Sequence, residues 1–114
     1  MENKHNFMYD DFSDRLFISC KKADEKVIGS IRTLNVNIDF GSDNKILNIE
    51  LKKASDFLKF LGIKPKILNE LKEANLVFRN CRDGYLIYFV LKTDNQIERI
   101  PYNIRSVKTS VTLK

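Results

Sequence analysis

The chain has 114 residues and a mass of 13.3 kDa, and its 20 Lys and Arg against 15 Asp and Glu give a formal net charge of +5. A chain of this length fits one domain that buries about two-thirds of the surface its unfolded form exposes. No apolar run approaches the roughly 20 residues that a membrane helix needs. Two cysteines cannot make a disulfide framework or a four-ligand zinc site. Residues Met1–Asn6 are polar and lack the apolar core of a signal peptide, so we expect a single cytoplasmic domain over residues 1–114.

The first segments predict a hairpin with an acidic turn. Phe7–Tyr9 is a short apolar run, and Arg15–Cys20 is the expected returning strand. The aspartates of the turn, Asp10–Asp14, lack the ligand spacing and terminal Glu of a calcium-binding loop, so they predict a plain turn. A charged connection over Lys21–Lys26 then leads to Val27–Leu34, which feeds the next hairpin.

Strict alternation identifies that next hairpin. Apolar residues alternate with Asn or Asp over Leu34–Phe40, and with Asn, Glu or Lys over Leu47–Lys52. This is the period of a half-buried strand. One register puts every apolar side chain on one face, and its pairs are Phe40 with Leu47, Ile38 with Ile49 and Val36 with Leu51. A one-residue slip would turn the apolar side chains of one strand into water, so the pattern predicts this register.

Helical spacing replaces the alternation after the hairpin. Ser55 is a suitable N-cap and Gly62 a suitable stop, so a first helix is expected over Ala54–Gly62. Pro65 suits the first turn of a second helix over Lys66–Ala74. Its apolar stripe consists of Ile67, Leu68 and Leu71.

The remaining segments predict an antiparallel meander. Leu76–Cys81 and Tyr85–Thr93 flank Asp83-Gly84, a strong two-residue hairpin signal. Ile97–Ile100 is a further strand, and Pro101 marks it as an edge. Residues 105–114 are mostly polar, and we expect them to form a loosely held tail. The expected fold is α+β, with antiparallel hairpins over 8–62, a meander over 65–104 and two short central helices packed on the sheet.

Several short motifs now combine into a recurring layout. They are Tyr9-Asp10, Ser13-Asp14, Leu16-Phe17-Ile18, Asn37-Ile38-Asp39-Phe40, Asp43, Ile49-Glu50-Leu51 and Ala54-Ser55. Over residues 7–61, about half of the chain, this layout resembles domain-of-unknown-function family 2283, small prokaryotic proteins without an established activity. Gly41, Ser42 and Asn44 depart from the acidic and glycine residues of the family's turn. The later strand pairs resemble longer, archaeal-type relatives. The resemblance implies a fold and no activity.

Candidate catalytic groups are few. Asp39 and Glu50 share the polar face of the predicted hairpin and could hold a cation or divide acid and base roles. A solvated face that uses charge against aggregation explains them better. His5 is the only histidine, and Cys20 and Cys81 fit small packed side chains better than nucleophiles. We expect no enzyme activity, no cofactor and no metal site.

The later strands carry the candidate functional residues. With Asp83-Gly84 as the turn, Arg79 lies opposite Tyr88, and Arg99 lies opposite Val90 across the next hairpin. One face of the meander therefore carries Arg79, Leu86, Tyr88, Val90 and Arg99. The opposite face is the expected core and carries Phe78, Ile87, Phe89 and Ile100.

Three uses of this face are open. It could stack single-stranded bases, form a subunit interface rich in Tyr and Arg, or lie under the two helices. The interface is favoured because Tyr85–Leu91 is apolar on both faces and two short helices are too few to cover them. The lysines also form no stripe that would follow phosphates. The sequence predicts a non-catalytic interaction protein, a homodimer through Leu86, Tyr88 and Val90, with nucleic-acid binding by Arg79, Tyr88 and Arg99 as the alternative.

Overall fold

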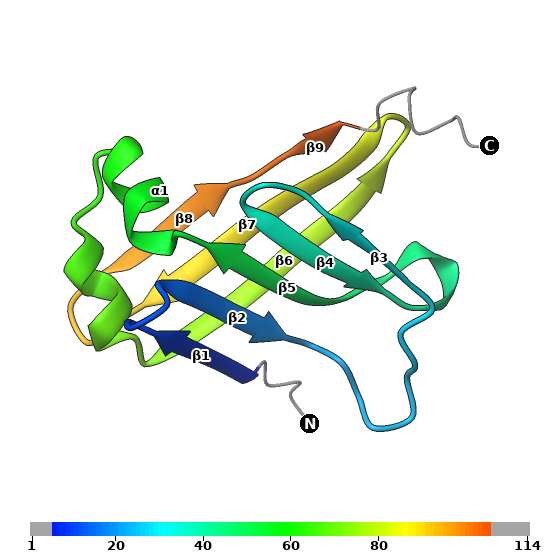
Figure 1. Cartoon of the computed structure of the whole chain (residues 1–114), viewed down its shortest axis with the longest axis horizontal. Helices are drawn as coiled ribbons and strands as arrows, with labels where there is room; N and C mark the ends of the chain where they lie inside the picture. The colour runs from blue at the N-terminus through cyan, green and yellow to red at the C-terminus, as the bar shows by residue number, and fades with distance from the viewer. Residues whose placement is uncertain (1–5, 106–114) are drawn as a thin grey trace.

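The structure of the protein is a computed structural model, and residues 6–105 are described. In this range two antiparallel sheets lie against each other (Figure 1). Sheet A has the spatial order β1-β2-β5-β4-β3. Its strands are β1 (Asn6–Asp10), β2 (Arg15–Ser19), β3 (Gly29–Arg32), β4 (Val36–Phe40) and β5 (Ile46–Lys52). The central strand β5 thus pairs with one strand from each of the first two hairpins.

Sheet B is formed by the later part of the chain. Strand β7 pairs with β6 on one side and with β8 and then β9 on the other. The strands are β6 (Glu73–Cys81), β7 (Gly84–Lys92), β8 (Ile97–Pro101) and β9 (Ile104–Arg105). Three short helical segments complete the described chain: η1 (Ser42–Asn44), α1 (Ala54–Phe60) and η2 (Pro65–Glu70). The expected α+β class is confirmed, and most of its regular structure is strand.

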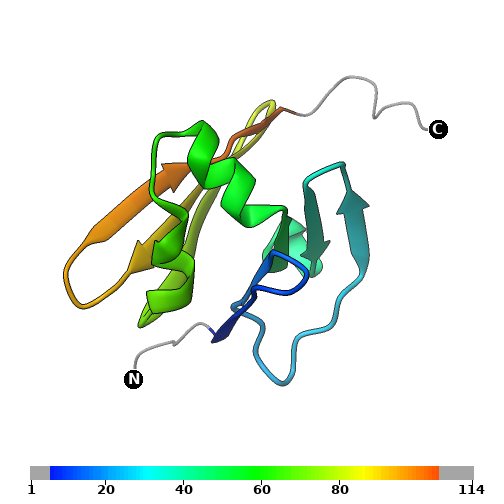
Figure 2. The ribbon, with the colours of Figure 1, turned by 60° about the vertical axis from the view of Figure 1, so that its left-hand side comes forward.

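The core lies between the inner faces of the two sheets. Sheet A contributes fully buried residues such as Ile18, Ile38 and Ile49, and sheet B contributes Ile87 and Phe89. Figure 2 shows α1 and η2 lying between the sheets at one side of the molecule. Their buried residues, Ala54, Leu58, Ile67 and Leu68, belong to the same apolar cluster. The helices therefore close the gap between the sheets, where burial of apolar surface is the main stabilising contribution.

The predicted hairpin is right for two of its three pairs. Val36 pairs with Leu51 and Ile38 with Ile49, but Phe40 pairs with Ile46 instead of Leu47. The register shifts between Asp39 and Phe40, as happens when one strand carries an extra residue in a β-bulge. Both Ile46 and Leu47 are fully buried. Ile46 belongs to the core between the sheets and Leu47 is buried against Gly41, so two consecutive apolar residues are removed from water, which strict alternation cannot do.

The first helix begins differently from the expectation. Lys53 occupies the cap position with a left-handed backbone (φ 54°) and makes no side-chain cap hydrogen bond, so Ser55 is not the N-cap. The capping acceptor comes from the β1–β2 turn instead. The Asp14 carboxylate accepts hydrogen bonds from the Ser55 backbone N (2.9 Å) and from Ser55 Oγ (2.7 Å). The helix start is thus held by a residue 41 positions away in the chain.

The second predicted helix is also shorter and tighter than expected. Residues Pro65–Glu70 form the 3₁₀ helix η2, with Pro65 in its first turn as predicted. The chain then becomes strand β6 at Glu73, so Ala74 lies in a strand. Ala74 is buried opposite Leu91. Pairing along the long strand β7 therefore outweighs the helical spacing at the end of this segment.

The β6–β7 hairpin is shifted by two residues from the predicted register. Cys81 pairs with Gly84, so Arg82 and Asp83 form the turn instead of Asp83 and Gly84. Gly84, the residue directly after this turn, has a positive φ of 145°, which glycine adopts without strain. The shift is even, so every side chain keeps its predicted face. The edge position of β8 is confirmed, and the predicted loose tail lies outside the described residues from residue 106 onward.

Candidate interaction surface

The outer face of sheet B brings all five predicted site residues together. We call this surface the Tyr88 face and define it by the outward-pointing residues Asn75, Val77, Arg79, Leu86, Tyr88, Val90, Arg99 and Pro101. Tyr88 lies at its centre, between Val77 on β6 and Pro101 on β8. Arg99 lies opposite Val90 as predicted, whereas Arg79 lies opposite Leu86 and only diagonal to Tyr88. This correction follows from the two-residue shift of the hairpin.

The centre of the Tyr88 face is apolar and open. Val77 is 53% exposed and Tyr88 is 43% exposed, while Leu86 and Val90 are half-buried. Val77 and Pro101, which lie on either side of Tyr88 in the central row, were not among the predicted site residues. Alternation along β6 does place Val77 on this face, but only the correct register places it beside Tyr88.

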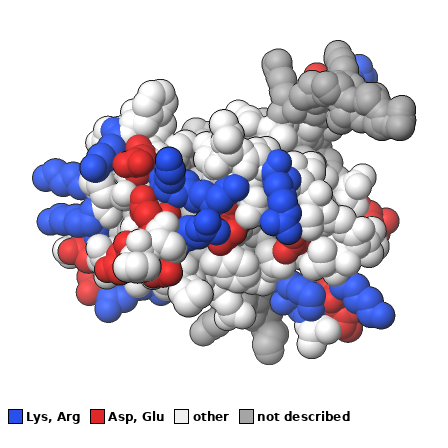
Figure 3. Space-filling view, in the orientation of Figure 1, with Lys and Arg blue, Asp and Glu red and all other residues white. Residues whose placement is uncertain are grey.

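Charged residues border this apolar centre. Arg79 and Arg99 are exposed and make no ion pair within the described part of the chain. At one end of the face Lys92 Nζ lies 3.3 Å from Glu73 Oε1. Figure 3 shows the other kind of surface on this molecule, where basic and acidic side chains are intermixed on the face in view. Arg79 and Arg99 therefore lie without an ion-pair partner among the described residues at the border of the apolar centre.

The two helical segments do not cover the Tyr88 face. Their buried side chains point into the core between the sheets, and Figure 2 shows both segments on the inner side of sheet B. The third use considered above, a face buried under helices, is therefore wrong.

The outer face of sheet A is polar and internally bonded. Ser19 Oγ donates to Asn48 Oδ1 (2.6 Å), Asn48 Nδ2 donates to Asp39 Oδ2 (2.9 Å), and Ser30 Oγ donates to Asp39 Oδ1 (2.8 Å). This chain of hydrogen bonds crosses four strands. In the next row Glu50 accepts from Asn37 Nδ2 (2.9 Å). Asp39 and Glu50 thus share one face as predicted, and each is hydrogen bonded to its neighbours.

A second polar cluster joins β1, the β1–β2 turn and α1. Tyr9 OH donates to Asp14 Oδ1 (2.6 Å), and both Ser55 donors reach the same carboxylate. Burial opposes the charge on Asp14, but these hydrogen bonds outweigh it and hold the pKa of Asp14 below its ordinary value. Burial and the bond to Asp14 raise the pKa of Tyr9. The only sequence signal for this cluster was the acidic turn itself.

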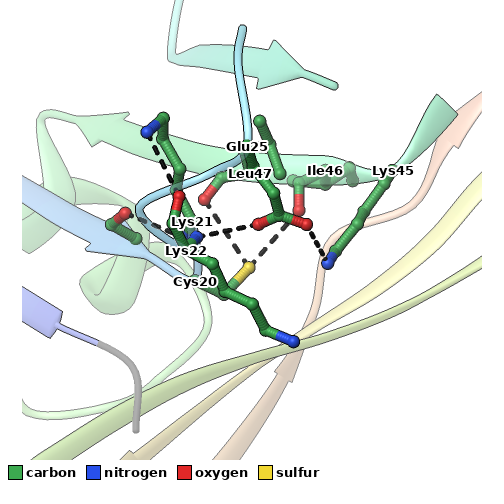
Figure 4. Close-up of polar contacts among 8 residues, drawn as sticks. Cys20, Lys21, Lys22, Glu25, Lys45, Ile46 and Leu47 are labelled. Carbon is green, nitrogen blue, oxygen red and sulfur yellow. Dashed lines mark hydrogen bonds and ion pairs between the residues drawn. The ribbon is translucent and has the colours of Figure 1, made fainter. Parts of the chain in front are cut away.

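The two cysteines lie in different environments. Figure 4 shows Cys20 beside the Lys45–Glu25 pair, with its Sγ–H directed at the backbone oxygens of Ile46 and Leu47. Burial raises the pKa of the Cys20 thiol. Hydrogen bonding to Lys45 lowers the pKa of Glu25 and raises that of Lys45. Cys81 is exposed, so the expectation that it packs as a small apolar side chain is wrong.

Within residues 6–105 no three His, Cys, Asp or Glu side chains lie where they could hold a metal ion together. His5 lies outside the described range. In the acidic turn Asp10 accepts bonds from the Phe12 backbone N and from Ser13 Oγ, the pattern of an ordinary Asx turn. Among the described helices there is none with the length and apolar character to span a membrane.

Comparisons with protein-family models, with curated proteins and with solved structures return no significant match. The resemblance to domain-of-unknown-function family 2283 therefore stays a prediction.

Proposed function

We propose that this protein is a non-catalytic protein-interaction module that forms a homodimer through the Tyr88 face. The observation that carries the proposal is the row Val77–Tyr88–Pro101, which runs across three strands with Val77 53% and Tyr88 43% exposed. Burying a large apolar side chain that was exposed contributes about 1.5–3 kcal/mol. A contact that covers this row therefore gains from several side chains at once.

The composition of the face supports a protein partner. Interfaces are enriched in Tyr and Arg, with apolar side chains at the centre and polar groups at the rim. The Tyr88 face has this arrangement, since Arg79 and Arg99 lie on either side of the central row. An arginine that stacks on a partner's aromatic ring keeps its charge partly hydrated while its stem covers apolar surface.

The register also supports a second copy as the partner. A symmetric dimer places the same patch on both sides of a two-fold axis. If the two-fold axis passes through Tyr88 and runs along β7, Arg99 lies opposite Asn75 of the second copy. If the axis passes through Tyr88 and runs across the strands, Arg79 lies opposite Asn75 of the second copy. Neither arrangement sets one arginine against another. The two copies can therefore meet at Tyr88 without repulsion between their cations.

Sedimentation velocity of Tyr88→Glu tests the proposal. The unmodified chain should sediment as an assembly of at least two protomers, and Tyr88→Glu should lower its mass because a carboxylate replaces the apolar centre of the contact. Met8→Glu is the matched control. Met8 is 62% exposed on the outer face of sheet A, so this variant adds the same charge and should leave the dimer intact. An equal loss of mass in both variants, or a Tyr88→Glu chain of unchanged mass, contradicts the proposal.

Nucleic-acid binding is the second candidate function. It is supported by two unpaired arginines that flank an exposed tyrosine, because aromatic side chains stack on bases and Arg pairs with phosphates. A single-stranded oligonucleotide should then bind at low salt, with affinity that falls as salt rises and falls again on Arg79→Ala or Arg99→Ala. Absence of binding at low salt excludes this candidate.

A further inference from the structure

The open edge of sheet A is a second unusual surface. Strand β3 ends this sheet and pairs only with β4. All four of its residues are exposed. Of the eleven large apolar side chains that are exposed in the described part of the chain, four lie within or beside β3: Val27, Ile28, Ile31 and Leu34. A short segment thus combines a free strand edge with clustered apolar side chains, which natural proteins normally avoid.

The backbone of β3 has unused hydrogen-bonding groups. Thr33 N donates to Val36 O at the β3–β4 turn, and antiparallel ladders alternate between bonded and non-bonded pairs. Gly29 and Ile31 therefore face β4, and the N–H and C=O groups of Ser30 and Arg32 point away from the sheet. Pro101 lies on edge strand β8, and β1 and β6 lie close to each other. Strand β3 has neither a proline nor a neighbouring strand at its edge.

The sequence of β3 is complementary to itself. We propose that two copies of this protein pair antiparallel along β3, with the two-fold axis at Ile31. In this register Ser30 of one copy pairs with Arg32 of the other, which joins the outward backbone groups in four hydrogen bonds. Ile31 faces its own counterpart in a non-hydrogen-bonded pair, the closest kind of side-chain contact in an antiparallel sheet.

The apolar side chains favour this register. Ile31 lies on the core side of sheet A, opposite the fully buried Ile38, yet it is 42% exposed because the sheet ends there. The Ile31–Ile31 contact extends the core across the junction. Ile28 (70% exposed) precedes β3 and Leu34 (97% exposed) lies in the β3–β4 turn that follows it, so the same axis brings Ile28 of one copy near Leu34 of the other.

The charges favour it too. On the outer face Ser30 lies opposite Asp39 and donates a hydrogen bond to it (2.8 Å). Within residues 6–105 neither Asp39 nor Arg32 forms an ion pair. Pairing Ser30 with Arg32 of the second copy brings that guanidinium next to Asp39. The two-fold axis repeats the contact, so each copy contributes one cation and one anion.

Pairing at β3 goes beyond the homodimer proposed above. The Tyr88 face belongs to sheet B and the β3 edge to sheet A, so one protomer can use both. Two separate symmetric contacts build assemblies larger than a dimer, as in tetramers with three two-fold axes. Each contact must therefore be tested with the other removed.

Disulfide trapping tests the register in the full-length chain. Single cysteines are placed by Ile31→Cys, Ile28→Cys and Leu34→Cys in a background with Cys20→Ala and Cys81→Ser. Position 31 meets its counterpart directly, within the roughly 4.4–6.8 Å between Cα atoms that a disulfide spans. Position 28 lies about 20 Å from its counterpart, since six residues separate it from the paired position. It instead meets position 34 of the other copy.

We expect the Ile31→Cys chain to form covalent dimers at least about tenfold faster than Ile28→Cys under mild oxidation. An equimolar mixture of Ile28→Cys with mass-tagged Leu34→Cys should give mainly the mixed dimer. Equal rates at positions 28 and 31 would indicate random collision and overturn the proposal, as would the absence of any dimer.

Sedimentation separates this proposal from the first one. In the Tyr88→Glu background the β3 pair should still give a concentration-dependent dimer, and adding Ile31→Lys should abolish it, since a lysine blocks an edge. Met8 is an exposed position on edge strand β1, and adding Met8→Lys should not abolish the dimer. A Tyr88→Glu chain that stays a single protomer at all concentrations overturns β3 pairing. If the unmodified chain and Tyr88→Glu are both dimers, and Ile31→Lys dissociates that dimer, the Tyr88 face fails and β3 pairing stands.

Discussion

The Asp14 cluster gives the sharpest stability prediction. Asp14 accepts hydrogen bonds from Tyr9 OH, Ser55 N and Ser55 Oγ, and thereby ties β1 and the β1–β2 turn to the start of α1. Its own backbone has φ 58°, a left-handed conformation that glycine adopts freely. Asp14→Gly therefore removes the carboxylate without adding backbone strain. The variant measures what the three hydrogen bonds contribute.

The expected loss is about 2–3 kcal/mol of the free energy of unfolding. A hydrogen bond to a charged group contributes about 1.5–3 kcal/mol, and loss of a helix cap costs about 1 kcal/mol. The contributions overlap here because the same carboxylate makes all the bonds. For a chain of this size the loss lowers the midpoint of thermal unfolding by about 10 °C. Urea unfolding followed by circular dichroism should show a lower midpoint with an unchanged slope.

Asp43→Gly is the matched control. Asp43 has nearly the same backbone angle (φ 59°), is exposed, and makes no side-chain hydrogen bond with other described residues. The same substitution there should change the free energy of unfolding by less than about 0.5 kcal/mol. If Asp14→Gly loses no more stability than Asp43→Gly, the carboxylate does not hold the helix start and the reasoning is wrong.

The pH dependence of Asp14→Asn provides an independent check. The hydrogen bonds hold the pKa of Asp14 below 3.8 in the folded protein. A depressed pKa contributes stability that is fully present above the ordinary pKa and is lost as the pH falls through the folded value. The difference in stability between the unmodified chain and Asp14→Asn should therefore be constant near neutral pH and shrink below about pH 4. A difference that stays constant down to pH 2 contradicts this origin.

Two further predictions concern Gly41 and the two cysteines. A Cβ at Gly41 would lie 2.8 Å from Cδ1 of the fully buried Leu47, so Gly41→Ala should lower the free energy of unfolding by about 1–3 kcal/mol. Gly29 has open space around it, so Gly29→Ala should not lower the free energy of unfolding. Chemical denaturation measures both variants. A thiol reagent should modify the exposed Cys81 quickly and Cys20 slowly, because burial raises the pKa of the Cys20 thiol; equal rates in the folded protein would contradict this assignment.

The sequence predicts local structure well wherever one face of a strand is buried and the other is not. The pairs Val36–Leu51 and Ile38–Ile49 follow from alternation alone. The pair Phe40–Leu47 fails because Ile46 and Leu47 are both apolar, and alternation gives no sign of a register shift that buries them both. The prediction of the β6–β7 turn is wrong for a related reason, since the turn lies at Arg82-Asp83. Both possible registers preserve the faces, so the apolar pattern cannot choose between them.

Contacts between distant segments could not be read from the sequence. Nothing in the pattern of β5 shows that it pairs with β2 as well as with its hairpin partner β4. The cap that Asp14 provides for α1 spans 41 residues, while the local signal pointed to Ser55. The composition of the Tyr88 face was predicted because it depends only on which residues share a face. Its central row was not, since that depends on register.

The two outer faces of the molecule differ in what a partner would gain from them. On sheet A the Ser19–Asn48–Asp39–Ser30 chain satisfies its polar groups internally, so a protein docking there would have to match or break existing bonds. On sheet B a partner that covers the exposed Val77 and Tyr88 would remove their apolar surface from water, which is favourable. At the end of sheet A the same reasoning applies to β3, whose outward backbone groups would exchange hydrogen bonds to water for hydrogen bonds to another strand. We therefore propose binding at the Tyr88 face and the β3 edge, and not on the hydrogen-bonded outer face of sheet A.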